Sequence, residues 1–168
     1  MKCRACGFDN IDGVDRCEEC MEPFRDQDVP RPMEGLQARI MLDPIRELCT
    51  ANPASVSQED SVLRAVEVMK ERRAGCVLIL QEGTLKGILT EFDLLFKLEG
   101  KDQHLDRINV TELMTPHPEY VDEDCMIAFA LNMMSVGGYR HLPVVRDGKV
   151  VGILSIKDLL AYLKQQLL

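Results

Sequence analysis

The chain repeats itself, and this repeat limits the possible folds more than any other feature of the sequence. The stretch GILTEFDLL, which begins at Gly87, returns 65 residues later as GILSIKDLL, which begins at Gly152. The same offset continues to match residues without a gap back to Glu47 and Glu112. Because self-similar segments of this size fold into equivalent units, we expect two copies of one structural unit of about 50 residues.

Hydrophobic periodicity predicts the order of elements within each copy. Apolar residues recur at helical spacing from Val62 to Met69 and from Ile127 to Met134. Each of these helices is followed by two short apolar strands, which a turn containing glycine joins, and then by a second amphipathic helix. A short extended segment precedes each first helix, at Val56 and at Val121. Each copy is therefore expected to run β-α-β-β-α.

The two copies are expected to share one core. A unit of about 50 residues buries too little of its surface to be comfortably stable alone, so the copies should pack sheet against sheet. We therefore predict an α+β fold with pseudo-twofold symmetry. Its expected parts are a first unit at residues 42–98, a polar connector at 99–109 and a second unit at 110–168.

Composition is typical of a globular protein and excludes several other classes. Apolar residues make up 46% and charged residues 29%, which is too apolar for a disordered chain. No stretch approaches the roughly 18 apolar residues of a membrane-spanning helix, and the N-terminus has no apolar signal region, so we expect a cytoplasmic protein. The formal net charge of -8 argues against binding to nucleic acid or to an anionic membrane, both of which are negative.

The motifs and their order resemble a pair of CBS domains, an arrangement called the Bateman module. The resemblance covers roughly residues 42–165 and is carried by the gapless repeat, ELMTPHP, RHLPVV on a strand and G-x-x-[ST]-x-x-D at a strand-to-helix turn. The first copy departs from the pattern at RAGCVLIL, which contains neither His nor Pro. The resemblance implies a disc whose cleft binds adenosine-containing ligands such as AMP, ADP, ATP or S-adenosylmethionine. It also implies a module that regulates or senses and is not an enzyme.

The repeated motif itself allows two interpretations. Thr90 and Ser155 fit helix N-cap positions, and Asp93 and Asp158 fit the third helical position of a capping box, so both motifs can be helix starts and nothing more. The alternative is a ligand site. Amides and a hydroxyl at a helix N-terminus bind phosphate, and a carboxylate beside them accepts hydrogen bonds from a ribose diol. Together with the resemblance, this chemistry favours ligand binding.

Further candidate ligand-binding residues surround the two motifs. An adenine slot is expected near the short first strand of each copy and the strand that follows the helix. The candidates in and next to these segments are Thr50, Val56, Thr115, Val121 and Pro143. Arg140, His141 and Lys157 add positive charge to the second motif, whereas Glu91 adds negative charge to the first. We expect two unequal clefts, and the second should prefer phosphorylated adenosines.

The N-terminus carries a separate four-cysteine motif. Cys3, Cys6, Cys17 and Cys20 form two C-x2-C pairs that are separated by ten residues. Four thiolates in this pattern suit the closed tetrahedral shell of structural zinc, and residues 1–28 resemble a short zinc ribbon, so we expect one zinc per chain. Iron would use the same ligands but is disfavoured by the short gap. A disulfide is disfavoured in a reducing cytoplasm.

Three classes of function remain open. The first is a regulatory module that signals to an unidentified partner protein when an adenine nucleotide binds. The second is a structural adaptor whose cleft stays empty. The third, an enzyme or redox carrier at the four cysteines, is the weakest, because no catalytic triad or open metal-site pattern accompanies them.

The surroundings of the repeat also suggest partners. Residues 1–28 carry eight acidic and four basic side chains, which favours protein docking or a stabilising role over contact with nucleic acid. The linker at 29–41 begins with VPRPMEG and should be stiff. We also expect a homodimer, because apolar residues on the first helices, among them Met69, Met133 and Met134, have no further unit in this chain to cover them.

Overall fold

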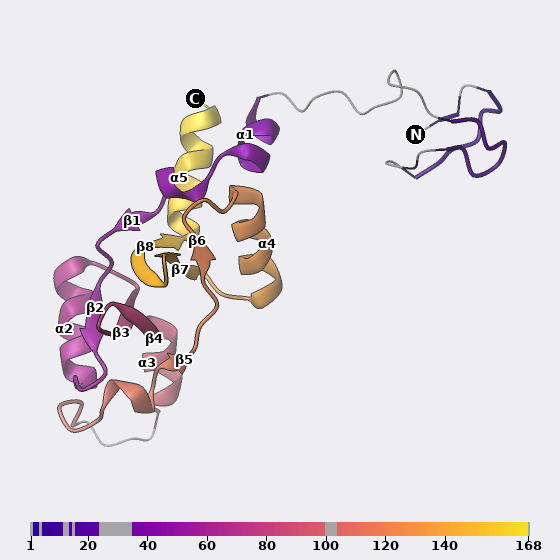
Figure 1. The fold of residues 1–168 in the computed structure, drawn as a ribbon. Coiled ribbons are helices and arrows are strands. Elements are labelled where there is room, and N and C mark those ends of the chain that lie inside the picture. The colour runs from indigo at the N-terminus through magenta and orange to yellow at the C-terminus, as the bar shows by residue number, and fades with distance from the viewer. Residues whose placement is uncertain are drawn as a thin grey trace. The chain divides into compact units, whose positions relative to one another are not determined.

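The structure, a computed structural model, describes residues 2–3, 5–11, 14, 16–23, 35–99 and 104–167. The chain forms two compact units, Met1–Gly35 and Leu36–Leu168, and each is treated by itself below. Residues 29–34 of the predicted linker and 100–103 of the predicted connector lie outside the described residues. Figure 1 shows the order of the elements.

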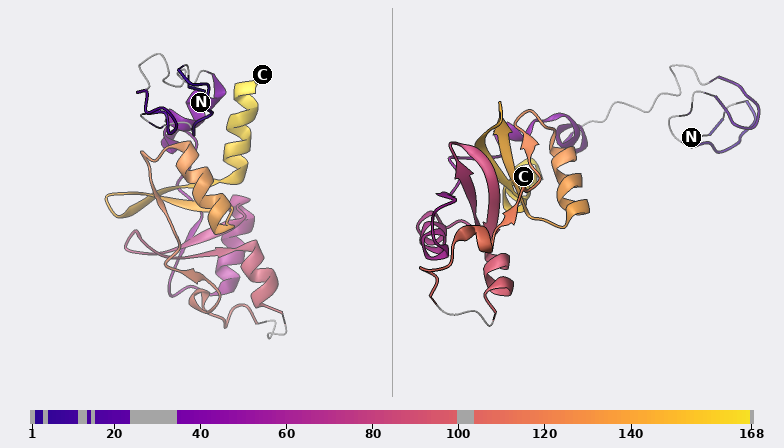
Figure 2. Two further views of the ribbon diagram at one scale, coloured as in Figure 1. Left: turned by 90° about the vertical axis from the view of Figure 1, so that its right-hand side faces the viewer. Right: turned by 60° about the horizontal axis from the view of Figure 1, so that its bottom comes forward.

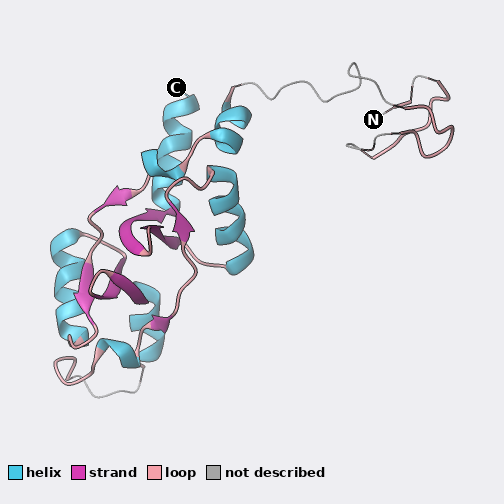
Figure 3. Ribbon diagram, viewed as in Figure 1, coloured by secondary structure: helices cyan, strands magenta, loops and turns pink. Residues whose placement is uncertain are grey.

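The larger unit contains the predicted β-α-β-β-α arrangement twice, which confirms the α+β fold. The first copy consists of β2 (Ser55–Ser57), α2 (Val62–Arg72), β3 (Cys76–Gln81), β4 (Thr84–Thr90) and α3 (Glu91–Lys97). The second copy consists of β6 (Val121–Asp122), α4 (Ile127–Gly137), β7 (His141–Arg146), β8 (Lys149–Ser155) and α5 (Ile156–Leu167). The strands of both copies lie at the centre of the unit, and the helices lie outside them (Figure 3).

The two hairpins have the turn that the sequence predicted. Glu82 and Gly83 have φ angles of 51° and 80°, and Asp147 and Gly148 have φ angles of 50° and 75°. Two successive residues with positive φ form the tight loop whose twist matches that of the flanking strands, and glycine adopts this conformation at little cost. The repeated Gly at the second turn position therefore fixes the register of both hairpins.

A leader precedes each copy, and the structure shows that the two leaders are exchanged. The first contains α1 (Leu36–Leu42), the 3-10 turn η2 (Ile45–Glu47) and β1 (Thr50–Ala51); the second contains η3 (Val110–Glu112) and β5 (Thr115–Pro116). Strand β1 pairs with β8 of the second copy, and β5 pairs with β4 of the first. The sheet orders are therefore β1-β8-β7-β6 and β2-β3-β4-β5. This exchange was not predicted from the sequence.

Backbone hydrogen bonds repeat the exchange at the start of the helices. The amide of Ile127, the first residue of α4, donates to the carbonyl of Asp43 at 3.0 Å. The amide of Val62, the first residue of α2, donates to the carbonyl of Ile108 at 2.8 Å. Helix N-termini have amides without partners inside the helix, so each leader supplies an acceptor to the helix of the opposite copy.

The buried side chains follow the same pattern. Ile45 is fully buried in the second core together with Leu142 and Leu154, whereas Val110 and Leu113 of the other leader are fully buried in the first core. A third cluster of Cys76, Leu78 and Ile88, with Val150 and Ile153 packed against it, joins the two sheets. Figure 2 shows the two copies side by side in two further views.

Two of the methionines that were expected to be exposed are not. Met69 and Met134 are buried in the first and second cores, and Met133 is partly buried against the second core. The expectation was wrong because each helix turns these side chains toward its own sheet. The exposed apolar side chains of α3 are Phe92, Leu95 and Phe96. In the described part of the chain, no helix is long and apolar enough to span a membrane.

The exchange of leaders predicts the effect of a substitution in the first leader. Ile45→Ala should lower the free energy of unfolding by roughly 2–5 kcal/mol, because it leaves a cavity in the core of the second copy. Leu42→Ala is the matched control, because this leader side chain is exposed and its loss should cost within about 0.5 kcal/mol. Denaturant unfolding followed by circular dichroism measures both. Equal small losses would contradict the packing of this leader on the second core.

Candidate functional site

The repeated motif forms two capping boxes. At the start of α3, the Thr90 amide and hydroxyl donate to Asp93 Oδ2 at 2.9 and 2.6 Å, and the Asp93 amide donates to Thr90 Oγ1 at 3.2 Å. At the start of α5, Ser155 and Asp158 make the same three hydrogen bonds at 2.8, 2.5 and 3.3 Å. The predicted helix starts are confirmed. The amides of Glu91 and Ile156, the first residues of α3 and α5, already donate to the carbonyls of Gly75 and Arg140 at 3.1 and 3.0 Å, so an anion at either helix start would have to use the other amides of the first turn.

A cavity of about 830 Å³ lies between the two copies, and both helix starts line it. This volume falls within the range of ordinary small-molecule sites. Seven of the predicted ligand-binding residues line the cavity: Thr90, Asp93, Thr115, Arg140, His141, Ser155 and Lys157. These residues were predicted to lie in two separate clefts, whereas the structure brings all seven to the same cavity.

The other five predicted residues do not line this cavity. Val56 and Val121 are buried in the first and second cores, and Pro143 is buried in β7. Thr50 lies in β1, where it pairs with Ile153. The fifth residue is Asp158, whose carboxylate accepts hydrogen bonds from the amide and the hydroxyl of Ser155.

Several lining residues were missed by sequence analysis. They come from the segment after β5 and from the segment before β7: His117, Pro118, Glu119, Gly138 and Tyr139. The first three reach the cavity because β5 pairs with β4, which ends beside α3. The motif ELMTPHP covered this segment, but its place beside the other copy could be known only after the exchange of leaders was seen.

The cavity carries charges of both signs. Arg140 and Lys157 supply positive charge, and Glu91, Asp93 and Glu119 supply negative charge. Burial lowers the pKa of His141, and Arg140 lowers it further, while Glu91 acts in the opposite direction. A Cβ atom at Gly75 would lie 3.4 Å from His141 Nε2 and 3.6 Å from Glu91 Oε2. These are ordinary van der Waals distances, so only a side chain larger than a methyl group at Gly75 would have to displace these two groups, which come from different copies.

Asp93 is held in its ionised form. Burial raises the pKa of this carboxyl, but hydrogen bonds from Lys97 and from Thr90 outweigh burial and lower the pKa overall. Lys97 Nζ lies 2.7 Å from Asp93 Oδ1 and also donates to the carbonyl of Leu113 at 2.7 Å. The cavity therefore contains a fixed carboxylate beside the start of α3.

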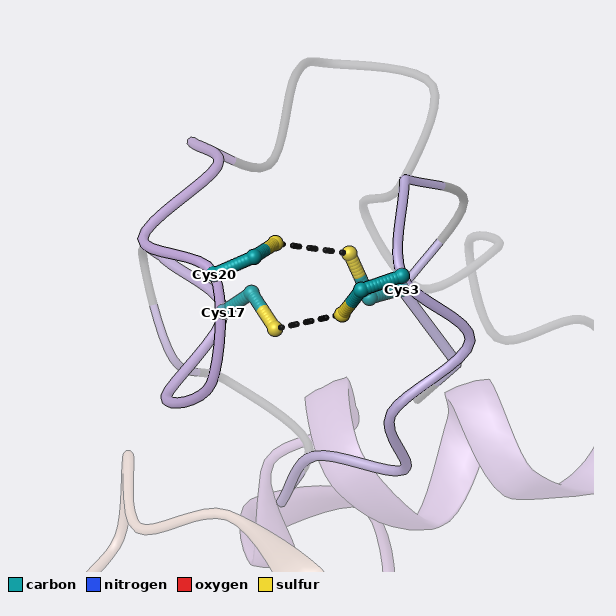
Figure 4. Close-up of side chains that lie close together, drawn as sticks. Cys3, Cys17 and Cys20 are labelled. Carbon is teal, nitrogen blue, oxygen red and sulfur yellow. Dashed lines mark hydrogen bonds between the residues drawn. The ribbon is translucent and has the colours of Figure 1, made fainter.

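The four cysteines of the N-terminal unit come together (Figure 4). Their Sγ atoms all lie within 4.8 Å of one another. Each C-x2-C pair forms the same loop: the amide of Gly7 donates to the Cys3 carbonyl at 2.9 Å, and the amide of Met21 donates to the Cys17 carbonyl at 2.9 Å. Both loops use a positive φ, 78° at Gly7 and 60° at Met21.

The surroundings of Cys17 favour its thiolate, whereas the pKa of Cys6 and of Cys20 is raised, because burial and the neighbouring thiols outweigh backbone hydrogen bonds. Burial raises the pKa of Cys17, but amides of Cys20 and Glu19 and the side chain of Asn10 outweigh burial and lower the pKa overall. Asn10 is buried, and its Nδ2 lies 3.6 Å from Cys17 Sγ while its Oδ1 accepts from the Glu18 amide at 2.9 Å. Metal binding requires thiolates, and outer hydrogen bonds of this kind orient them. The cluster can hold one metal ion in a closed four-sulfur shell.

Comparison with known proteins gives one family. The family description "CBS domain" matches the chain twice, at residues 45–100 and 110–165. CBS domain-containing protein CBSCBSPB5 of Arabidopsis thaliana is 31% identical over 127 residues, which are 74% of this chain and 23% of that protein. CBS domain-containing protein YhcV of Bacillus subtilis (strain 168) is 28% identical over 122 residues, which are 70% of this chain and 84% of that protein. The chain thus spans about a quarter of the plant relative.

Solved structures show the same fold. The crystal structure of a CBS domain, NE2398, has a TM-score of 0.68 and 31% identity, and the alignment covers 72% of this chain and 98% of that one. The crystal structure of CBSX2 in complex with AMP has a TM-score of 0.65 and 26% identity, and covers 73% of this chain and 97% of that one.

The electrostatics of the cavity predict the titration of His141. Its pKa should lie below the ordinary 6.5, so folding stability is lost as the pH falls from the unfolded pKa through the folded one. Glu91→Gln should lower the pKa further, and Arg140→Gln should raise it, because their charges act on the imidazolium with opposite sign. NMR titration of the imidazole measures all three values. A pKa above 6.5, or shifts of the same sign in both variants, would contradict this arrangement.

Proposed function

The chain belongs to the CBS-domain family, and from that premise we propose that it is a regulatory module that binds an adenine nucleotide. The observation that carries the proposal is the cavity, which has a fixed carboxylate at one helix start and cations at the other. A filled cavity would change how the module contacts a partner protein. The proposed role is regulatory and not catalytic. The related CBSX2, whose structure holds AMP, supports an adenine nucleotide as the ligand.

The phosphate would lie at the start of α5. Ser155 and Lys157 line the cavity there, and Arg140 faces it from the segment before β7. The positive end of a helix and the paired donors of arginine both favour phosphate. His141 is neutral above its lowered pKa, and a bound phosphate would favour its protonated form. These cations favour AMP, ADP or ATP over S-adenosylmethionine, which carries no phosphate.

The sugar and the base would lie nearer to the first copy. Asp93 is a carboxylate in the cavity wall, which suits the hydroxyl groups of ribose. Ile88 and Pro118 supply apolar lining for the adenine ring. In this arrangement Asp158 serves as a helix cap, and the phosphate-binding residues of the second copy act together with the ribose-binding residue of the first.

The N-terminal unit and the surface of α3 extend the proposal. We propose that zinc occupies the four-cysteine cluster and stabilises this unit; iron is the alternative metal. We also propose a homodimer in which a second copy covers the exposed residues of α3, where the Phe92 and Phe96 ring centroids lie 4.1 Å apart. Thiolate ligands agree with a cytoplasmic location.

The nucleotide proposal predicts a selective loss of phosphate binding. Lys157→Met should weaken AMP binding by about tenfold or more, because a charge-assisted hydrogen bond is worth roughly 1.5–3 kcal/mol, and should leave adenosine binding nearly unchanged. Lys164→Met is the matched control, because Lys164 lies on the same helix but does not line the cavity. Isothermal titration calorimetry with AMP, ADP, ATP and S-adenosylmethionine measures the affinities, and light scattering on the same samples reports the dimer.

Two outcomes of that titration would count against the proposal. If no adenine ligand binds, the motifs are helix caps only and the adaptor class is favoured. If AMP binds equally well to the wild type and to Lys157→Met, the phosphate does not lie at the start of α5.

The metal proposal predicts one zinc per chain. A unit of this size has too small a core to fold without a metal or another cross-link, so Cys17→Ser combined with Cys20→Ser should lose the ion and unfold the N-terminal unit. Cys49→Ser combined with Cys125→Ser should keep it, because neither thiol belongs to the cluster. Elemental analysis of the purified proteins measures the zinc and iron content of the wild type and of both double variants. Metal retained after loss of both Cys17 and Cys20 would contradict the site, and iron in place of zinc would identify the alternative.

A further inference from the structure

The residue that pairs with Asp93, the carboxylate in the cavity wall, is not the same in the two copies. Lys97 lies four residues after Asp93 on α3 and pairs with its Oδ1 atom at 2.7 Å. The equivalent residue of α5, 65 positions later, is Tyr162. Its hydroxyl donates to Asp43 Oδ2 at 2.6 Å, so Tyr162 binds the first leader and not Asp158. The repeat therefore gives its two capping carboxylates different partners.

The different partners leave the two carboxylates with different numbers of free acceptor positions. A carboxylate offers about four lone-pair positions. Thr90 uses two of those on Asp93, through its amide and its hydroxyl, and Lys97 uses a third. One position remains for a ligand. Ser155 uses two positions on Asp158 in the same way, and within the described residues no cation pairs with Asp158, so two positions remain there.

Lys97 is held in place by more than Asp93. Its Nζ also donates to the carbonyl of Leu113, a fully buried residue that lies just before β5. The Asp93 side chain is only 13% exposed and that of Lys97 is 40% exposed, so the pair is partly shielded from water. Lys97 thus connects α3 to the segment that carries Thr115 into the cavity wall.

We propose that Lys97 determines the sugar specificity of the cavity. It fills one acceptor position of Asp93, which leaves room for a single ribose hydroxyl. The inference rests on the proposed function, in which the sugar of an adenosine phosphate lies at Asp93. Since either hydroxyl can use the one free position, AMP and its 2′-deoxy and 3′-deoxy analogues should bind with affinities within about threefold of one another.

Removal of the lysine should make tight binding depend on both ribose hydroxyls. In Lys97→Met, two positions of Asp93 are free, so both hydroxyls bind and each deoxy analogue should bind about tenfold or more weaker than AMP. The quantity to measure is the ratio of the affinity for AMP to the affinity for each deoxy analogue. The loss of the positive charge affects all three ligands alike and so does not change this ratio. Lys97→Arg should keep the low ratio of the wild type, since guanidinium still donates to the carboxylate. Tyr162→Phe, the equivalent change in the other copy, should keep it as well.

Calorimetric titration of AMP, 2′-deoxyAMP and 3′-deoxyAMP into the full chain and these three variants provides the test. A low ratio in the wild type, Lys97→Arg and Tyr162→Phe with a high ratio in Lys97→Met supports the proposal. A ratio of about tenfold already present in the wild type would overturn it without any variant. A ratio that stays low in Lys97→Met would overturn it too. Failure of the wild type to bind AMP would instead overturn the proposed function, and this inference with it.

Discussion

The exchange of leader strands is the constraint on which the rest of the larger unit depends. It is possible because the strand that receives each leader has glycine at the contact. A Cβ atom at Gly87 would lie 2.3 Å from Met114 Sδ and 3.2 Å from the Thr115 carbonyl oxygen. At Gly152 it would lie 3.1 Å from both Cys49 Sγ and the Thr50 carbonyl oxygen. The exchanged strands also cover the outer edges of β4 and β8, which would otherwise present unpaired backbone groups.

The cavity is a consequence of this exchange. Strand β5 belongs to the second leader but lies beside β4, so the residues that follow it, from His117 to Glu119, reach the start of α3 in the first copy. The start of α5 faces the same space from the second copy. A ligand in the cavity would therefore touch both copies at once and respond to their relative position. This geometry gives a physical route from binding to regulation, because the two cores can shift only if the shared strands follow.

Features set by neighbours in the sequence were predictable, and features set by packing between the copies were not. The hairpin turns, both capping boxes and the cysteine pairs depend on residues a few positions apart, so their spacing was enough to predict them. The shared cavity depends on which face of each element meets the other copy, and the burial of Met69 depends on which face of α2 meets its own sheet. A glycine inside a strand usually marks a close backbone approach, but the positions of Gly87 and Gly152 in the sequence do not reveal which segment approaches.

Some departures from symmetry lie at the cavity, and electrostatics accounts for them. The repeat pairs Gly75 with Arg140, Cys76 with His141 and Phe92 with Lys157. Five of these six residues line the cavity, and the sixth, Cys76, is buried. Two identical copies would therefore place two sets of cations in one space. Like charges so close repel strongly, and a second bulky side chain at Gly75 would meet His141. One copy thus provides the room and the other the positive charge, which would give a ligand in the shared cavity a single favoured direction.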